Sequence, residues 1–127
     1  MKKICVSSSY DDRGKMIEVV NGMLESSECI VLYPQFLDRR PTEKEKISLM
    51  RSHFFKMSVS EYFVFVFDTK FGTNTLMELG YALNLAERKR IVALLNKEQE
   101  IPDEIACGTV KIYNKVVDAV EYIKSIW

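Results

Sequence analysis

The sequence predicts an α/β protein, a three-layer sandwich with a five-stranded parallel sheet of flavodoxin or Rossmann type. Apolar strand-like segments alternate along the whole chain with segments of helical periodicity. Two strand segments, 62–67 and 91–95, are apolar throughout, which is typical of strands buried on both faces of a parallel sheet. With right-handed crossovers, we expect the strand order 2-1-3-4-5. The 127 residues suffice for one core, so residues 1–127 are expected to form a single domain.

Each predicted element follows from a local pattern of residues. The expected strands are short apolar runs at 4–7, 29–33, 62–67, 91–95 and 110–113. Apolar residues spaced three and four apart mark helices around 16–24, 76–86 and 116–127. Another helix, ending near Ser60, is predicted after Thr42, which precedes Glu45 by three residues as an N-cap residue would. The stretch 96–107 is expected to be a polar connection.

The composition limits the partners that the chain is expected to bind. Lys and Arg together number 18, as do Asp and Glu, so no overall charge favours nucleic acid or an anionic membrane. A small-molecule ligand fits such a chain better. The longest apolar run is far shorter than the roughly 20 residues of a membrane span, and the N-terminus has no signal-peptide core. We therefore expect a cytoplasmic protein that binds neither nucleic acid nor membrane.

The three cysteines do not predict a disulfide or a metal site. Cys5, Cys29 and Cys107 are an odd number, lie far apart and form no CxxC pair. His53 is the only imidazole that could join them as a ligand. We expect buried, reduced thiols and no metal.

The loop after the first strand is a candidate ligand site. In an open sheet of the predicted order, ligands bind beside the loops that follow the first and third strands. Hydroxyls and backbone amides ahead of a helix suit a phosphate or a sugar hydroxyl, and an arginine adds a fork of donors. The predicted binding residues of this loop are Ser7, Ser8, Ser9, Tyr10 and Arg13. The same residue types also occur in turns and caps without any ligand, so this loop alone does not distinguish a ligand site from a structural turn.

The loop after the third strand leads into a helix that contains Glu78. Thr75 and Glu78 fit a capping box, which would place Glu78 in the first helical turn and give it a purely structural role. Gly80 favours a different interpretation, because glycine inside a helix costs about 1 kcal/mol relative to alanine. It predicts a close backbone approach or room for a ligand beside Tyr81.

The segment 61–83 resembles a known family. The strand YFVFVFD, the loop GTNT and the helix start MELGYAL are similar to the nucleoside 2-deoxyribosyltransferase family, which includes deoxynucleoside 5′-monophosphate N-glycosidases. In that family the glutamate of an ELGYA-type helix is the nucleophile, and Glu78 is the matching residue. The resemblance therefore implies that residues 1–127 are one domain of this kind.

The resemblance implies cleavage or transfer of the N-glycosidic bond of 2′-deoxynucleosides or their 5′-monophosphates. Glu78 would attack C1′ through an oxocarbenium-like transition state, and water or a second base would resolve the resulting ester. No cofactor or metal is implied. The expected partners are a small nucleoside or nucleotide and further copies of the chain in a homo-oligomer. The implied catalytic residues are Glu78, Asp68 and Tyr81, and the substrate-binding residues are Ser7, Ser8, Ser9, Tyr10, Arg13, Gly72, Thr73 and Asn74.

Individual roles within this set stay open, and so do two other functions. Either Asp68 or Asp11 would protonate the leaving base, and either Tyr81 or Tyr10 would orient Glu78. A phosphoacceptor receiver domain shares this layout of five strands. It requires an acidic pair after the first strand, an aspartate at the end of the third and a lysine at the end of the fifth. Asp11 and Asp12, Asp68 and Lys111 nearly meet these requirements. A noncatalytic nucleotide-binding module would instead use Glu78 to bind a ribose hydroxyl.

Some polar residues are left out of the predicted site. Arg39 and Arg40 could reach a 5′-phosphate, but an exposed basic pair is usually solvated surface. His53 lies in a helical stretch with Met50 and Met57, where a lone histidine more often serves helix packing than catalysis.

Overall fold

The computed structural model describes residues 1–26, 28–106 and 111–127. Its five strands form one parallel sheet in the order β2-β1-β3-β4-β5, which confirms the predicted fold class and strand order. The strands are β1 (Lys2–Ser8), β2 (Cys29–Leu32), β3 (Tyr62–Phe67), β4 (Ile91–Leu95) and β5 (Lys111–Tyr113). Val110, which was expected to begin the fifth strand, and Cys107 lie outside the described residues.

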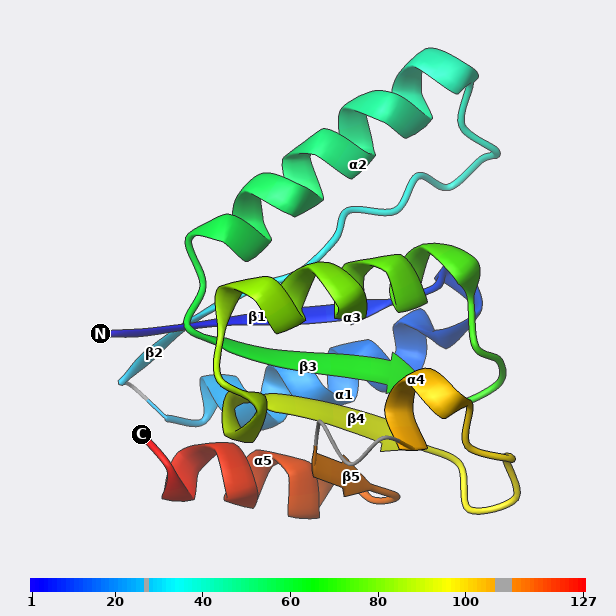
Figure 1. Cartoon of the computed structure of the whole chain (residues 1–127). Helices are drawn as coiled ribbons and strands as arrows, with labels where there is room; N and C mark the ends of the chain where they lie inside the picture. The colour runs from blue at the N-terminus through cyan, green and yellow to red at the C-terminus, as the bar shows by residue number, and fades with distance from the viewer. Residues whose placement is uncertain (27, 107–110) are drawn as a thin grey trace.

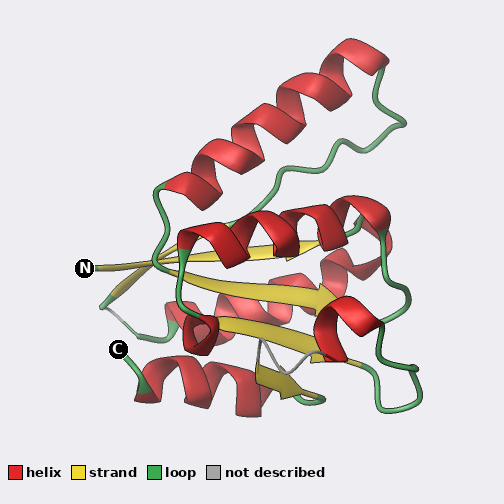
Figure 2. Cartoon of the chain, in the orientation of Figure 1, coloured by secondary structure: helices red, strands yellow, loops and turns green. Residues whose placement is uncertain are grey.

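Helices cover both faces of the sheet (Figures 1 and 2). They are α1 (Arg13–Leu24), α2 (Glu43–Ser58), α3 (Thr73–Leu85), α4 (Asp103–Ala106) and α5 (Val116–Ser125), with 3-10 turns at Tyr10–Asp12 and Arg88–Arg90. One core lies between the sheet and α1 and α5, and the other between the sheet and α2, α3 and α4. Helix α4 was not expected within the connection 96–107, and its Ile105 is fully buried in the second core.

The alternation of side chains along β1 decides which residues face the second core. Ile4 and Val6 pack into the core on the α1 side, whereas Cys5 belongs to the core on the α2 and α3 side. Because successive side chains of a strand point to opposite faces, Ser7 lies on the same side as Cys5. This places a buried hydroxyl beneath α2 and α3 at the carboxyl end of β1.

Helix α2 leans away from the sheet, with its N-terminal end farthest from it (Figure 1). Of its 16 residues, His53 and Met57 are the buried ones, and both lie in the C-terminal half. The predicted N-cap at Thr42 is confirmed: the Thr42 hydroxyl accepts from the Glu45 amide, and the Glu45 carboxylate accepts from the Thr42 amide. The helix therefore forms a separate wall above the sheet.

Two further features concern the predictions on membranes and thiols. Within the described part of the chain, no helix combines the length and apolar character that crossing a membrane requires. Cys5 and Cys29 are free, buried thiols, as expected.

Candidate active site

The loops after β1 and β3 lie side by side at the carboxyl edge of the sheet, where the strand order places them. The buried carboxylate of Asp12 accepts hydrogen bonds from the Thr69 amide and the Thr69 hydroxyl, at 2.9 and 2.8 Å. The Lys70 ammonium lies 2.8 Å from the Asp11 carboxylate. These contacts join residues 57 or more positions apart in sequence, so the two predicted site loops form one unit.

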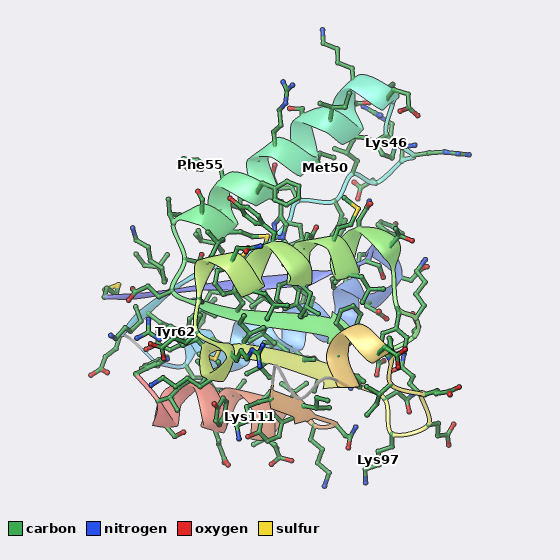
Figure 3. The ribbon with its side chains drawn as sticks, viewed as in Figure 1. Lys46, Met50, Phe55, Tyr62, Lys97 and Lys111 are labelled. Atoms are coloured by element: carbon green, nitrogen blue, oxygen red, sulfur yellow. The ribbon has the colours of Figure 1, made fainter. Side chains whose placement is uncertain are left out.

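A cavity of about 460 Å³ lies between these two loops and α2. This volume falls in the range that small-molecule sites occupy, roughly 300 to 1,000 Å³. Helix α2 and the segment before it supply the wall facing the loops, and Figure 3 shows two of the lining side chains of α2, Lys46 and Met50. The lining residues missed by the sequence analysis are Pro34, Gln35, Phe36, Pro41, Lys46, Leu49, Met50, His53, Lys70 and Thr75.

Most of the predicted binding residues line this cavity. They are Ser8, Ser9, Tyr10, Gly72, Thr73 and Asn74, together with Glu78. At Gly72 the two loops approach closely, since a Cβ built there would lie 3.4 Å from the Cβ of Ser9. Arg13 does not line the cavity: its guanidinium stacks 3.7 Å from the centroid of the Tyr10 ring and donates to the Tyr10 carbonyl. The Arg13 guanidinium thus contacts its own loop and is not placed as a hydrogen-bond donor in the cavity lining.

Asp68 and Tyr81 lie away from the cavity lining. Asp68 follows β3 and is half-buried. The Tyr81 ring packs edge-on against Phe54 of α2, with 5.1 Å between centroids. In this arrangement Tyr81 joins α3 to α2, one helical turn after Glu78.

The start of α3 differs from the sequence prediction. The helix begins at Thr73 with Gly72 as its N-cap residue, so Thr75 lies inside the helix and the expected Thr75–Glu78 capping box is wrong. The only capping box recorded among the described residues is the one at Thr42. Glu78 is consequently in the second turn of α3, where the favourable helix-dipole effect on a carboxylate has largely fallen off.

One of the two reasons expected for Gly80 does not hold. A Cβ built on Gly80 would meet no heavy atom within 4 Å in the described chain, and the residue is exposed. Gly80 therefore makes no close backbone approach within the described chain, and it is not among the residues that line the cavity.

His53 is the functional candidate that the sequence analysis excluded. Its Nε2 lies 2.7 Å from the Ser7 hydroxyl and 3.5 Å from Oε2 of Glu78. The His53 and Glu78 side chains are only 5% and 16% exposed. The spacing of Met50, His53 and Met57 by three and four residues could have shown that His53 shares the inward face of its helix.

The buried Cys5 thiol near Glu78 is uncharged. Burial and the nearby negative charge of Glu78 raise the pKa of the Cys5 thiol to about 12, despite smaller opposing effects of Ser7, Lys56 and Ser60. Cys5 therefore stays a neutral thiol near neutral pH. A carboxylate in such surroundings interacts more strongly with neighbouring polar groups than it would in water.

The residues that suggested a receiver domain do not form one acidic site. Asp12 accepts from Thr69, and Asp11 pairs with Lys70. Lys111 begins β5 instead of ending it, and its ammonium lies 5.8 Å from the centroid of the Tyr122 ring, beside α5 (Figure 3). It therefore lies at the amino end of its strand, whereas a receiver requires the lysine at the carboxyl end. The described residues also hold no group of three or more His, Cys, Asp or Glu suited to a metal ion.

Of the two arginines considered for phosphate binding, Arg39 is engaged in a contact with α2. The Arg39 guanidinium forms two hydrogen bonds to the Glu45 carboxylate, at 2.8 and 2.6 Å. This bidentate pair joins the segment before α2 to the first turn of that helix. Arg39 therefore belongs to the N-terminal cap of α2, whereas solvated surface was expected.

Comparison with known proteins gives relatives by structure. No known family profile matches the sequence, and no curated protein matches it. Among solved structures, a 2-deoxyribosyltransferase from the psychrotolerant bacterium Bacillus psychrosaccharolyticus matches with a TM-score of 0.69 and 13% identity, over 94% of this chain and 91% of that one. The CMP N-glycosidase BcmB of Clostridium botulinum matches with a TM-score of 0.63 and 18% identity, over 99% of this chain and 100% of that one. The chain therefore has the fold of the nucleoside 2-deoxyribosyltransferase-like family, which these two enzymes represent and which the sequence resemblance implied.

Proposed function

We propose that the chain cleaves or transfers the N-glycosidic bond of 2′-deoxynucleosides or their 5′-monophosphates, with Glu78 as nucleophile. One observation supports this proposal above the others. Glu78 lines a nucleoside-sized cavity formed by both predicted site loops, in a chain with the fold of a 2-deoxyribosyltransferase and a CMP N-glycosidase. A carboxylate suits the reaction because it stabilises positive charge at C1′ and then bonds to the same carbon.

The proposed reaction has two steps that balance without a cofactor. In the first step, a Glu78 oxygen bonds to C1′, and the N-glycosidic bond breaks with its electron pair leaving on the base nitrogen. The base nitrogen takes up a proton from an acid or from water. In the second step, water or another base attacks C1′ and gives up a proton to the solvent, and the ester bond breaks to restore the Glu78 carboxylate. Water gives hydrolysis, and a second base gives transfer.

The cavity lining includes residue types suited to both parts of such a substrate. Lys46 and Lys70 carry ammonium groups, and Ser9 and Thr73 carry hydroxyls. Cations and hydroxyl donors are the groups that bind phosphate. The apolar lining residues Pro34, Phe36, Leu49 and Met50 offer surface against which a base can pack. We therefore include 5′-monophosphates among the proposed substrates.

A direct assay tests the proposed activity. The protein is incubated with a panel of 2′-deoxynucleosides and their 5′-monophosphates, with and without a second free base, and free or exchanged base is measured by chromatography. We expect base release by the wild-type chain and none by Glu78→Ala. If no substrate yields base above the level of Glu78→Ala, the enzyme proposal fails.

A noncatalytic nucleotide-binding module is the second candidate. Glu78 is the only carboxylate among the described residues lining the cavity, so these residues supply no second carboxylic acid to protonate a leaving base. A module of this kind would bind the same nucleotides in calorimetry and release no base. The assay above therefore distinguishes the two functions.

We also propose that the chain forms a homo-oligomer through α2 and α3. Large apolar side chains are exposed on both helices, namely Ile47, Phe55, Met77 and Tyr81, and Val59 is exposed just after α2. Phe55 alone is 69% exposed and is labelled on α2 in Figure 3. Exposed apolar side chains on two adjacent helices are a feature of protein interaction sites. A second copy on this face would also cover α2, most of which lies apart from the rest of the chain.

A further inference from the structure

We infer that His53 is the positioning residue for Glu78 and that its imidazole carries its proton on Nε2, with Nδ1 unprotonated. Its consequence for catalysis rests on the proposed function above. The proton position on the imidazole does not rest on that function, because it follows from the geometry of two buried side chains and one largely buried side chain. These are Ser7 on β1, His53 on α2 and Glu78 on α3, which the fold brings together from three separate elements.

The contacts of Glu78 show an acceptor that lacks its donor. Oε2 of Glu78 is buried and has no hydrogen-bond partner among the described residues. A buried polar atom without a partner is costly, so such atoms are normally paired. The nearest nitrogen, Nε2 of His53, lies 3.5 Å away, slightly beyond hydrogen-bond distance. Hydrogen bonds in unliganded catalytic sites are often long and shorten when substrate binds.

The contacts of His53 favour one of its two neutral forms. Nδ1 is buried and also lacks a partner in the described chain, whereas Nε2 faces both the Ser7 hydroxyl at 2.7 Å and Oε2 of Glu78. With the proton on Nδ1, a buried N–H would have no acceptor, and a lone pair on Nε2 would face the lone pairs of Oε2. With the proton on Nε2, that N–H lies between two oxygen acceptors. The second form therefore leaves fewer groups unpaired.

This arrangement would orient the nucleophile without using up its reactive oxygen. Oε2 is buried against His53, while the Glu78 side chain as a whole keeps 16% of its surface exposed. A donor on Oε2 fixes the carboxylate and leaves the other oxygen open toward the cavity. Fixing a reacting group in this way matters because a misplacement of about 1 Å can cost about 100-fold in rate.

A nitrogen NMR experiment tests the imidazole state without any substrate. The chain contains one histidine, so ¹⁵N-labelled imidazole gives a single set of ring signals. A long-range ¹H–¹⁵N spectrum of the wild-type chain near pH 7.5 is expected to show a protonated Nε2 and an unprotonated Nδ1. We expect Glu78→Gln to shift the Nε2 signal more than the Nδ1 signal. A spectrum with the proton on Nδ1 would overturn the inference.

A kinetic experiment tests the consequence for Glu78. His53→Phe keeps an aromatic ring but removes the donor, whereas His53→Gln restores an N–H donor at a similar reach. We expect His53→Phe to lower kcat by about 100-fold with little change in KM, and His53→Gln to recover most of this loss. Equal losses in the two variants, or a loss confined to KM, would contradict a positioning role.

The two experiments separate failure of the inference from failure of the proposed function. If the wild-type chain releases no base, the proposed function fails, and the NMR result alone decides whether the imidazole is as inferred. If base is released but the spectrum shows the Nδ1 form, only the inference fails. Urea unfolding of both His53 variants checks that any loss of kcat is not a loss of folded protein.

Discussion

At the scale of single residues, Asp12 shows how the two site loops are held together. Its buried carboxylate accepts from both the amide and the hydroxyl of Thr69. We expect Asp12→Ala to lower the free energy of unfolding by about 1.5 to 3 kcal/mol, the range for hydrogen bonds to charged groups. Urea unfolding followed by circular dichroism measures this change.

The neighbouring residue provides the control. Asp11→Ala removes a carboxylate that is exposed and paired with the exposed Lys70, so we expect little change in stability. If the two variants unfold at the same urea concentration, the buried contact of Asp12 does not hold the loops.

Cys5 gives a second prediction at this scale. Burial and the charge of Glu78 raise its pKa to about 12, so at pH 8 almost no thiolate is present. Because the thiolate is the reactive form, we expect Cys5 to react with a thiol reagent only after unfolding. The measurement uses a Cys107→Ser variant with Ellman's reagent, with and without urea. Rapid labelling of Cys5 in the native protein, located by peptide mapping, would contradict the environment described for it.

The residues of the site differ in how far the sequence could predict them. Glu78 and the loop residues Ser8, Ser9 and Asn74 were predicted because they lie in or beside segments with a recognisable pattern and order. His53 was excluded because nothing in its local sequence shows that α2 turns it toward Ser7. That contact joins residues 46 positions apart and depends on the packing of α2 over the sheet.

At the scale of elements, the N-terminus of α2 is stabilised by its own side chains. The Thr42 hydroxyl accepts from the Glu45 amide, and the Glu45 carboxylate accepts from the Thr42 amide and the Arg39 guanidinium. We expect Thr42→Ala to cost about 1 kcal/mol, the usual effect of losing an N-cap. Thermal or urea unfolding measures this loss, and Thr73→Ala on α3 is the matched control because Thr73 is not the N-cap residue of its helix. An equal loss in the control would argue against a capping effect.

The same cap predicts a dependence of stability on pH. Hydrogen bonds from Arg39, and then from the Thr42 amide, lower the pKa of Glu45 from 4.5 to about 2. Its ionised form is therefore favoured by folding, and the stabilisation is present above pH 4.5 and lost as the pH falls toward 2. We expect Glu45→Gln to flatten the fall of stability over this interval.

A matched variant makes this prediction specific. Glu43→Gln removes the same charge from the same helical turn without breaking the hydrogen bonds to Arg39 and Thr42. Urea unfolding at several pH values compares the two. If Glu43→Gln flattens the profile as much as Glu45→Gln does, the effect belongs to overall charge and not to the cap.

Helix α3 shows why element boundaries are harder to predict than elements. Thr75 and Glu78 fit a capping box in sequence, which would start the helix at residue 76, but the helix begins three residues earlier, at Thr73. Gly72 serves as N-cap residue where the loop passes close to Ser9, a constraint that comes from another part of the chain. The sequence pattern at Thr42 and Glu45 was correct because its partners are all local.

At the scale of the whole molecule, the exposed apolar side chains of α2 and α3 predict self-association. We expect the wild-type chain to elute as an oligomer in size-exclusion chromatography with light scattering, because burial of such surface favours association. Phe55→Glu should shift the chain toward the monomer. Leu24→Glu is the control, since Leu24 is exposed to a similar degree on α1, on the other side of the sheet. A wild-type monomer would contradict the oligomer proposal.

The overall fold was predicted more fully than the site because the sequence patterns that determine it recur along the whole chain. Uniformly apolar strands such as β3 and β4 and the alternation with helices fix a parallel sheet, and the strand order follows from few alternatives. The unexpected helix α4 depends on the burial of Ile105 in a core formed by distant segments. The cavity likewise depends on the angle of α2 to the sheet (Figure 1), which no local pattern states.

The most direct test of the central claim is detection of the ester on Glu78. The chain is mixed with a 2′-deoxynucleoside or its 5′-monophosphate, quenched with acid during turnover, and examined by intact-mass and peptide mass spectrometry. We expect the wild-type chain to gain the mass of one deoxyribosyl group, with or without its phosphate, on the peptide that contains Glu78. Glu78→Ala should show no adduct. Base release without any adduct, or an adduct on a different residue, would contradict Glu78 as the nucleophile.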